Sequence, residues 1–204
     1  MLGFRGASRY THPYYNEVFE LECRVIKSIV EDLGLNNILI MIPFCRSVDE
    51  AAKVIHTTSC HGIFRKLDTE TTGIKVCMLC EIPSNIILID EFAPLFDGFL
   101  IGSNDLTQLT LGHDINSKVV TADIFDVRNP AVLKLIEMAI IGAKRNHKQV
   151  GICGQLPSDC PEVIEMLIRL GANSICIAVE NFMTTLSLIQ KYEVAELGWK
   201  EIIG

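Results

Sequence analysis

The sequence lacks the features that would place it among membrane-spanning, secreted or nucleic-acid-binding proteins. No apolar run reaches the roughly 18 residues that a membrane span needs. Residues 1–10 have neither the apolar core nor the cleavage pattern of a signal peptide. The formal net charge of -7 offers no general attraction to nucleic acid or anionic lipid. We therefore expect a cytoplasmic protein that binds neither nucleic acid nor membrane, and whose anionic ligands are held by local groups or a metal.

Aromatic and charged residues are also scarce. Aromatic residues make up 7% and charged residues 21%, whereas hydrophobic residues reach 49%. That apolar share is enough for a buried core and argues against a disordered chain. The 204 residues suit one ordinary domain, or part of a (β/α) barrel that would normally need about 250 residues.

A zinc-binding or disulfide framework is missing although the chain has eight cysteines. Most of them lie inside apolar segments, which in a reducing compartment indicates small core residues. Cys77 and Cys80 form a CxxC pair, but no second Cys or His pair follows at a zinc-finger spacing. We therefore expect neither disulfides nor structural zinc.

Short β-branched runs alternate with helical patterns along the chain. This order is expected when parallel strands are covered by helices on their outer side. Five strands are predicted, at residues 38–42, 76–82, 98–101, 149–152 and 174–177. The pattern predicts an α/β fold with about five parallel strands and outer helices.

Helix boundaries are marked by capping signals. Apolar residues three or four apart between positions 19 and 33 end at Gly34, and Ser47 with Glu50 forms a capping box that opens a helix to about residue 59. Pro83 and Pro130 suit the first turns of two further helices. Helices are also predicted at residues 161–170 and 181–191, and they complete the alternation of strands and helices. The polar segment 112–129 is longer than most connections and is interpreted equally as a lid or as a surface excursion.

Three polar motifs follow predicted strands directly: CEIPS at 80–84, GSNDLTQ at 102–108 and GICGQ at 151–155. In a parallel barrel, active-site groups gather at this end of the strands. Because neighbouring strands lie roughly 4.8 Å apart, Glu81 and Asp105 are placed to share one small cation. Two carboxylates with open water positions suit Mg²⁺. The alternative is that the two residues are unrelated and Asp105 only caps a helix.

Small polar residues and one thiol extend this candidate site. Gly102, Ser103 and Asn104 precede or open a helix whose free backbone N–H groups could bind a phosphate or carboxylate, although Ser103 and Asn104 could equally be helix caps. Cys153 lies between two glycines and could donate a proton or act as a nucleophile, although a buried structural cysteine is the commoner case. No histidine forms an evident pair with this cysteine.

The motifs together resemble the phosphoenolpyruvate synthase family. The stretches that carry the resemblance, in order along essentially the whole chain, are MLGFRGASRY, IMIPFCRSVDEA, CEIPSN, FDGFLIGSNDLTQLTLGHD, NPAVLKLIEMA and VGICGQLPSD. Pyruvate phosphate dikinase and the first enzyme of the bacterial sugar phosphotransferase system have related barrels. The resemblance implies the phosphoenolpyruvate/pyruvate type of partial (β/α)8 TIM barrel over residues 1–204, the C-terminal part of the full barrel.

The resemblance also implies roles for individual residues. Glu81 and Asp105 match the family's magnesium ligands, which also contact substrate. Gly102, Ser103 and Asn104 match substrate-binding positions, and Cys153 matches the proton donor to the enolate carbon. Arg5 matches an arginine near the phosphoryl group. Arg46 is a candidate only because it follows a strand end. The last predicted strand departs from the family, because it lacks the polar turn that usually follows it.

The family reaction converts ATP, pyruvate and water to AMP, phosphoenolpyruvate and phosphate through a phosphohistidine on a mobile domain. This chain would contribute the second half, transfer of the phosphoryl group to the enolate of pyruvate. Its expected partners are pyruvate or phosphoenolpyruvate and the phosphohistidine domain of the full-length enzyme, since neither that domain nor the nucleotide-binding domain is recognisable in the chain. Two further substrate arginines of the family would precede Met1, so turnover by the isolated chain is doubtful.

Two other functions remain open at this point. The chain could be a non-catalytic remnant that binds pyruvate or a partner protein, or a standalone lyase that uses magnesium–enolate chemistry without phosphate. Open sheet edges would favour self-association, for example as a homodimer, unless the missing strands cover them.

Overall fold

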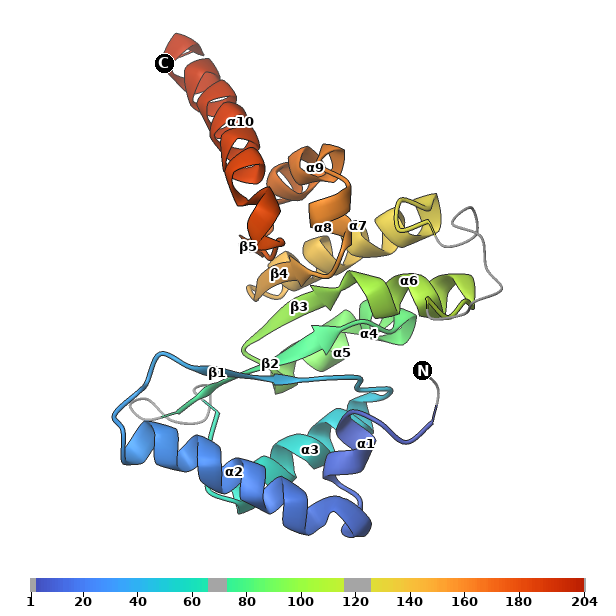
Figure 1. Ribbon diagram of the computed structural model, residues 1–204, viewed down its shortest axis with the longest axis vertical. Coiled ribbons are helices and arrows are strands. Elements are labelled where there is room, and N and C mark those ends of the chain that lie inside the picture. The colour runs from blue at the N-terminus through green and yellow to red at the C-terminus, as the bar shows by residue number, and fades with distance from the viewer. Residues whose placement is uncertain (1–2, 66–72, 116–125, 204) are drawn as a thin grey trace.

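Five parallel strands form one sheet among the residues that the computed structural model describes, 3–65, 73–115 and 126–203. The strands are β1 (Leu39–Ile42), β2 (Lys75–Cys80), β3 (Gly98–Gly102), β4 (Gln149–Cys153) and β5 (Ser174–Ile175). Each pairs with its neighbours in the sequence, in the order β1-β2-β3-β4-β5 (Figure 1). This consecutive order is that of a barrel wall, because the strand order of a doubly wound sheet reverses. The expected partial barrel is confirmed.

Helices connect the strands and cover the sheet. They are α1 (Ala7–Tyr10), α2 (Asn16–Glu31), α3 (Val48–Cys60), α4 (Pro83–Ile87), α5 (Ile89–Phe92), α6 (Ser103–Leu111), α7 (Pro130–Arg145), α8 (Leu156–Asp159), α9 (Glu162–Leu170) and α10 (Phe182–Ile203). Short 3-10 turns lie at η1 (Pro13–Tyr15), η2 (Ala93–Leu95) and η3 (Val179–Asn181). Figure 1 shows α2 and α3 at the β1 end of the sheet, and α8 and α9 near β4 and β5.

The capping signals act largely as the sequence predicts. Ser47 Oγ accepts a hydrogen bond from Glu50 N at 3.2 Å and so opens α3. The reciprocal bond of the expected capping box is displaced by one residue, because Glu50 Oε2 accepts from Arg46 N at 2.6 Å. Asn129 caps α7 in front of Pro130, with Oδ1 accepting from Ala131 N at 2.9 Å.

The two faces of the sheet differ in burial. The pairing register aligns four strand residues in one row on the helix-covered face, and all four are at most 4% exposed: Ile42, Met78, Phe99 and Val150. Successive residues of a strand point to opposite faces. Leu79 and Leu100, one position further along, therefore lie on the other face and are only partly buried. The main core thus lies between the sheet and its helices.

Two strands end earlier than the sequence predicts, for identifiable reasons. β2 stops at Cys80 because the backbone N–H groups of Glu81 and Ile82 both donate to Asn85 Oδ1, at 3.2 and 3.0 Å. β5 stops at Ile175 instead of residue 177. Shortly beyond it, Ala178 N donates to Ser158 Oγ at 2.9 Å, which draws the chain toward α8.

Two further expectations have mixed outcomes. Most of the eight cysteines are core residues, as expected, because Cys23, Cys45, Cys77, Cys80 and Cys160 are buried; Cys153 is partly exposed, and Cys60 and Cys176 are exposed. The segment 112–129 lies partly outside the described residues, at 116–125. Its role as lid or surface excursion therefore stays a prediction.

Among the described residues, no helix is long and apolar enough to cross a membrane.

The buried core predicts unequal effects of two phenylalanine truncations. Phe92 in α5 is fully buried, so Phe92→Ala should lower the free energy of unfolding by about 3–5 kcal/mol. Phe182 opens α10 with 55% of its surface exposed, and Phe182→Ala should change it by less than about 0.5 kcal/mol. Urea unfolding followed by circular dichroism measures both, and similar losses for the two variants would contradict this assignment of the core.

Candidate active site

Four groups meet at the carboxyl ends of the strands. The register pairs Cys80 with Ile101 and Gly102 with Cys153, so Glu81, Gly102 and Cys153 continue as one row across β2, β3 and β4. This row lies on the face of the sheet opposite the main core, by the alternation of strand side chains. Asp105 comes to the same place from the first turn of α6, directly after β3. The structure therefore brings together the carboxylates and the thiol that the sequence singles out.

Glu81 is held in a buried position by the chain that follows β1. Its residue is 2% exposed, and its Oε1 accepts a hydrogen bond from Phe44 N at 2.8 Å. Phe44 has a φ of 50°, an unusual conformation for a residue with a large side chain, and this turn aims the N–H group at the carboxylate. Asn85 fixes the backbone of Glu81 from the other side and also donates from Nδ2 to Cys45 O at 2.6 Å.

The carboxyl groups of Glu81 and Asp105 lie against each other. Burial, then the charge of Asp105 and a hydrogen bond with its side chain, raise the pKa of Glu81 from its ordinary value of 4.5 to about 8. The Phe44 N–H bond and the nearby Arg5 charge lower the pKa, but they do not cancel the rise. Without a cation, Glu81 therefore keeps its proton near neutral pH. Binding of a proton or a metal ion would therefore reduce the repulsion between the two carboxylates.

Gly102 makes this meeting possible. A Cβ atom at position 102 would lie 3.0 Å from both Cβ and Oε2 of Glu81. That is tighter than nearly all normal contacts of a Cβ atom. The absence of a side chain at Gly102 thus leaves the room that the Glu81 carboxylate occupies.

Arg5 brings positive charge to the edge of the pair. Its Nη2 lies 3.4 Å from Asp105 Oδ2, and its guanidinium group lies 4.2 Å from the centre of the Phe44 ring. The side chains of Arg5 and Asp105 are 36% and 22% exposed, so this ion pair is open to ligands on one side. Gln108 Nε2 donates to Asp105 Oδ1 at 3.1 Å and orients the carboxylate from within α6.

Arg46 supports Arg5 and lies on the same aromatic ring. Its guanidinium group is 4.9 Å from the Phe44 ring centre. Its Nη1 donates to Arg5 O at 3.1 Å and to Ser8 Oγ at 3.0 Å, and lies 3.3 Å from Glu50 Oε1. These contacts assign Arg46 a positioning role for the segment that carries Arg5, which its place after β1 alone did not reveal.

Ser103 and Asn104 tie α6 to the end of β4. Ser103 Oγ donates to Cys153 O at 2.9 Å, and Asn104 Oδ1 accepts from Gln155 N at 2.9 Å. The first turn of α6 has no side-chain cap, so the alternative that these residues act as caps does not hold. Gly154 makes the tie possible, because a Cβ there would lie 2.2 Å from Ser103 Oγ and its φ is 109°. We call this set of contacts the α6–β4 clasp.

The thiol of Cys153 stands at the end of this clasp, partly exposed. Burial, followed by the neighbouring groups Cys176 and Glu81, raises the pKa of Cys153 to about 11. The group is therefore a neutral thiol at physiological pH. A neutral thiol beside a carboxylate pair suits a proton donor better than a nucleophile, which must be a thiolate.

No group of three or more His, Cys, Asp or Glu side chains at metal-binding distance occurs among residues 3–65, 73–115 and 126–203. The two carboxylates of Glu81 and Asp105 are the ligands that this site offers. Such a pair suits Mg²⁺, which usually keeps several water molecules or substrate oxygens in its shell. Cys77 and Cys80 stand three residues apart in a strand and so point to opposite faces, which excludes their joint binding of zinc.

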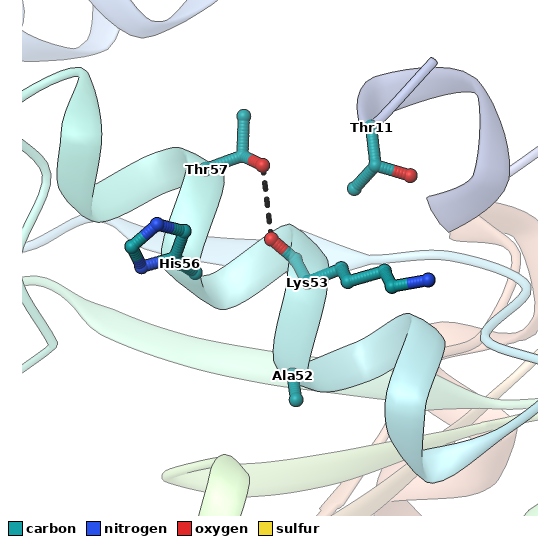
Figure 2. A pocket seen from close by; sticks show the side chains of 5 residues that line it. All are labelled: Thr11, Ala52, Lys53, His56 and Thr57. Atoms are coloured by element: carbon teal, nitrogen blue, oxygen red, sulfur yellow. Dashed lines mark hydrogen bonds between the residues drawn. The ribbon is translucent and has the colours of Figure 1, made fainter.

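Two surface hollows are lined by described residues. One hollow of about 370 Å³ is lined by Thr11 and by residues of α3, where Thr57 Oγ1 donates to Lys53 O at 2.9 Å (Figure 2). A second hollow adjoins it and shares Thr11 and Lys53. Both belong to the helical layer beside α1.

Three residues of the site were missed by sequence reasoning. Gln108 stands three positions after Asp105 on one helix, and that spacing is a detectable signal for a side-chain pair. Asn85 falls within the CEIPSN motif but carries no charge that would mark it. Phe44 acts through its backbone N–H and its ring, and nothing in the sequence pattern distinguishes it from a core residue.

Comparisons with known proteins identify the family of this chain. The profile of the family described as PEP-utilising enzyme, PEP-binding domain, matches residues 1–194. The chain is 48% identical to the phosphoenolpyruvate synthase of Synechocystis sp. over 96% of its length, and 47% identical to that of Helicobacter pylori over 95%. It is 46% identical to the phosphoenolpyruvate synthase of Escherichia coli over 91%. In all three, the match spans only 23% of the relative.

A solved structure supports the fold alone. The crystal structure of a HpcH/Hpal aldolase/citrate lyase family protein from Burkholderia cenocepacia superposes with a TM-score of 0.52 at 17% identity, covering 85% of this chain and 70% of that one. The profile match over nearly the whole chain and the sequence identities settle the family. The chain belongs to the PEP-utilising enzymes, of which it carries the PEP-binding domain.

Proposed function

We propose that the chain provides the pyruvate and phosphoenolpyruvate site of a phosphoenolpyruvate synthase. The observation that carries the proposal is the contact between Glu81 and Asp105 at the strand ends, in one row with the Cys153 thiol. The identity to proteins named phosphoenolpyruvate synthase supports it. Because the chain spans about a quarter of their length, the other steps of that reaction belong to other parts of such a protein.

Mg²⁺ fits the acidic pair. Two carboxylates in contact, one with its pKa raised to about 8, carry negative charge that the protein itself does not fully compensate. A divalent cation held by Glu81 and Asp105 offsets that charge and replaces the proton of Glu81. When bound, Mg²⁺ supplies polarisation of the substrate carbonyl.

The chain's own residues bind and orient the substrate in this proposal. The backbone N–H groups at the start of α6, at Ser103 and Asn104, bind a substrate carboxylate or phosphate, because the positive end of the helix dipole lies there. The clasp keeps Asn104 Oδ1 on Gln155 N, so Nδ2 is the end of that amide that donates to a substrate oxygen. Gly102 leaves the room in which the Glu81 carboxylate lies next to the start of α6.

Cys153 and Arg5 carry the reactive steps. The neutral thiol of Cys153 gives its proton to the C3 carbon of the substrate and recovers it when pyruvate loses one. Arg5, beside Asp105, offsets charge on the phosphoryl group during its transfer. The phosphoryl group passes between substrate and a histidine on another domain of the full-length enzyme, which is the partner of this site. Further arginines from that enzyme complete the charge compensation.

The raised pKa of Glu81 predicts that the metal-free chain loses stability as pH rises from about 5 to 8. The pKa is higher in the folded state than the ordinary 4.5, so the folded state binds more protons in this range and stability falls with pH. Thermal unfolding in a chelator should show a falling Tm, by about 2–4 °C for each kcal/mol lost. Glu81→Gln should flatten this slope, whereas Asp90→Asn, on the exposed surface, should keep it. A Tm that rises over this range in the unsubstituted chain would contradict the assignment.

Calorimetry with Mg²⁺ and oxalate, a mimic of the enolate, tests the acidic pair. Glu81→Gln and Asp105→Asn should each weaken oxalate binding by at least about tenfold, since each removes one metal ligand. The control is again Asp90→Asn, whose exposed carboxylate in α5 pairs with Arg145 in α7. Absence of binding at millimolar oxalate would instead favour a non-catalytic remnant.

Exchange of the methyl protons of pyruvate tests Cys153 without a phosphohistidine donor. In D₂O with Mg²⁺, proton NMR should show deuterium uptake above the buffer rate. Cys153→Ala should lower this rate by about 10²–10⁴-fold, the usual contribution of a general acid–base group. Cys60→Ser, which removes an exposed thiol at the end of α3, serves as the control and should leave the rate unchanged. Equal rates in the chain with and without the Cys153 thiol would exclude its proposed role.

A further inference from the structure

The Cys153 thiol has a second thiol beside it, from the segment that follows β5. β4 and β5 pair Gly151 with Ser174 and Ile152 with Ile175, so the next pair in register is Cys153 and Cys176. Cys176 N donates to Ile152 O at 2.9 Å, which continues the parallel ladder into this row. Residues in one row of a sheet project from the same face. Cys176 therefore extends the row of the candidate site by one strand.

The pair of residues before this one in the register, Gly151 and Ser174, is already in close contact. A Cβ atom at Gly151 would lie 2.2 Å from Ser174 Oγ, so the Ser174 hydroxyl lies directly against the backbone of β4. The two-residue period of a strand places Cys153 above Gly151 and Cys176 above Ser174. The electrostatic effect of Cys176 on Cys153 is a second sign that the two thiols are close.

The segments that carry these cysteines are tied again further along. Beyond Cys176, Ala178 N donates to Ser158 Oγ at 2.9 Å, and Asn181 Nδ2 donates to Ser158 O at 3.0 Å. Ser158 lies in α8, which follows Cys153 closely. Contacts on both sides thus keep the two thiols next to each other.

Geometry and exposure both suit a disulfide. Neighbouring strands are about 4.8 Å apart, within the Cα separation of about 4.4–6.8 Å that a disulfide requires. β5 has two residues and is the last strand of the described sheet, so a small shift of its end brings the Cβ atoms closer. Cys176 is exposed and Cys153 is partly exposed, whereas the five buried cysteines are shielded from a dissolved oxidant.

We propose that Cys153 and Cys176 are a redox modification site, at which a low-molecular-weight disulfide such as oxidised glutathione converts the two thiols into a reversible protein disulfide. The exposed Cys176 reacts first. Its sulfur attacks one sulfur of oxidised glutathione, releases one reduced glutathione and forms a mixed disulfide. The Cys153 thiol then loses its proton, and the resulting thiolate attacks the Cys176 sulfur and releases the second reduced glutathione; this step is slow at neutral pH because the pKa of Cys153 is raised to about 11. The protein loses two protons and two electrons, and the small disulfide gains both.

The consequence of this modification for catalysis rests on the proposed function. A disulfide occupies the sulfur of Cys153 and removes the thiol proton that the substrate carbon would receive. Because Glu81 and Asp105 stay in place, the acidic pair keeps its ligands. Oxidation would therefore stop proton transfer while leaving binding of an enolate mimic nearly unchanged, and a dithiol reductant would restore the thiol.

Peptide mapping tests the disulfide without reference to activity. The chain is incubated with oxidised glutathione, alkylated, and digested with trypsin without reduction. Cleavage after Lys148, Arg169 and Lys191 gives peptides 149–169 and 170–191, and the proposal predicts that they are joined. Peptide 149–169 also contains Cys160, so fragmentation between positions 153 and 160 must place the bond on Cys153. The denatured chain should lose two of its eight thiols.

Two variants sharpen the result. Cys176→Ser should give no joined peptides, whereas Cys60→Ser, which removes the other exposed thiol, should give them as the unsubstituted chain does. Glutathione found only as a mixed disulfide on Cys176, or a bond placed on Cys160, would overturn the proposal. The proposal would also be overturned if peptides 149–169 and 170–191 stayed unlinked in an excess of oxidised glutathione.

Function is measured separately on the same samples. The oxidised chain should lose methyl-proton exchange of pyruvate by about 100-fold or more, keep its oxalate affinity within about threefold, and recover exchange with dithiothreitol. A disulfide that forms in a chain without any exchange activity would support the modification site and count against the proposed function. Full exchange activity in a chain shown to be oxidised at Cys153 would overturn the regulatory consequence.

Discussion

The contact between two carboxyl groups, Glu81 and Asp105, is the constraint on which the candidate site depends. Like charges in a buried place repel, and the protein accepts this cost only because several groups hold the pair from outside. Phe44 gives a backbone N–H bond to one carboxylate, and Arg5 lies next to the other. The charge that remains is what a proton or a divalent cation neutralises, and this residual charge distinguishes a ligand site from a structural ion pair.

Backbone geometry places the remaining groups around that pair. A parallel sheet aligns equivalent positions of neighbouring strands, so one row contains a carboxylate, a glycine and a thiol from three strands. Gly102 and Gly154 permit the close approaches, the first beside Glu81 and the second beside Ser103. The α6–β4 clasp then fixes the thiol relative to the start of α6. Residues without side chains are thus as necessary to this site as the charged residues are.

The sequence predicts the parts of this structure that follow from local patterns. Apolar runs reveal the strands, and capping residues such as Ser47 reveal the helices, because these signals lie within a few residues of the elements that they define. Glu81 and Asp105 were found as polar residues after apolar strands. The bonds from Phe44 N to Glu81, from Arg46 to Arg5 O and from Ser103 to Cys153 O were not, because each joins segments that are far apart in the chain.

The ion pair of Arg5 and Asp105 joins residues 100 positions apart. Closing so long a loop costs conformational entropy before any contact compensates for it, so such contacts form late when a chain folds. The strands and helices between them are more local and form earlier. During synthesis on a ribosome, Arg5 is translated before Asp105, so the ion pair cannot form until Asp105 has been added to the chain. The charge balance of the site is therefore completed among the last events of folding.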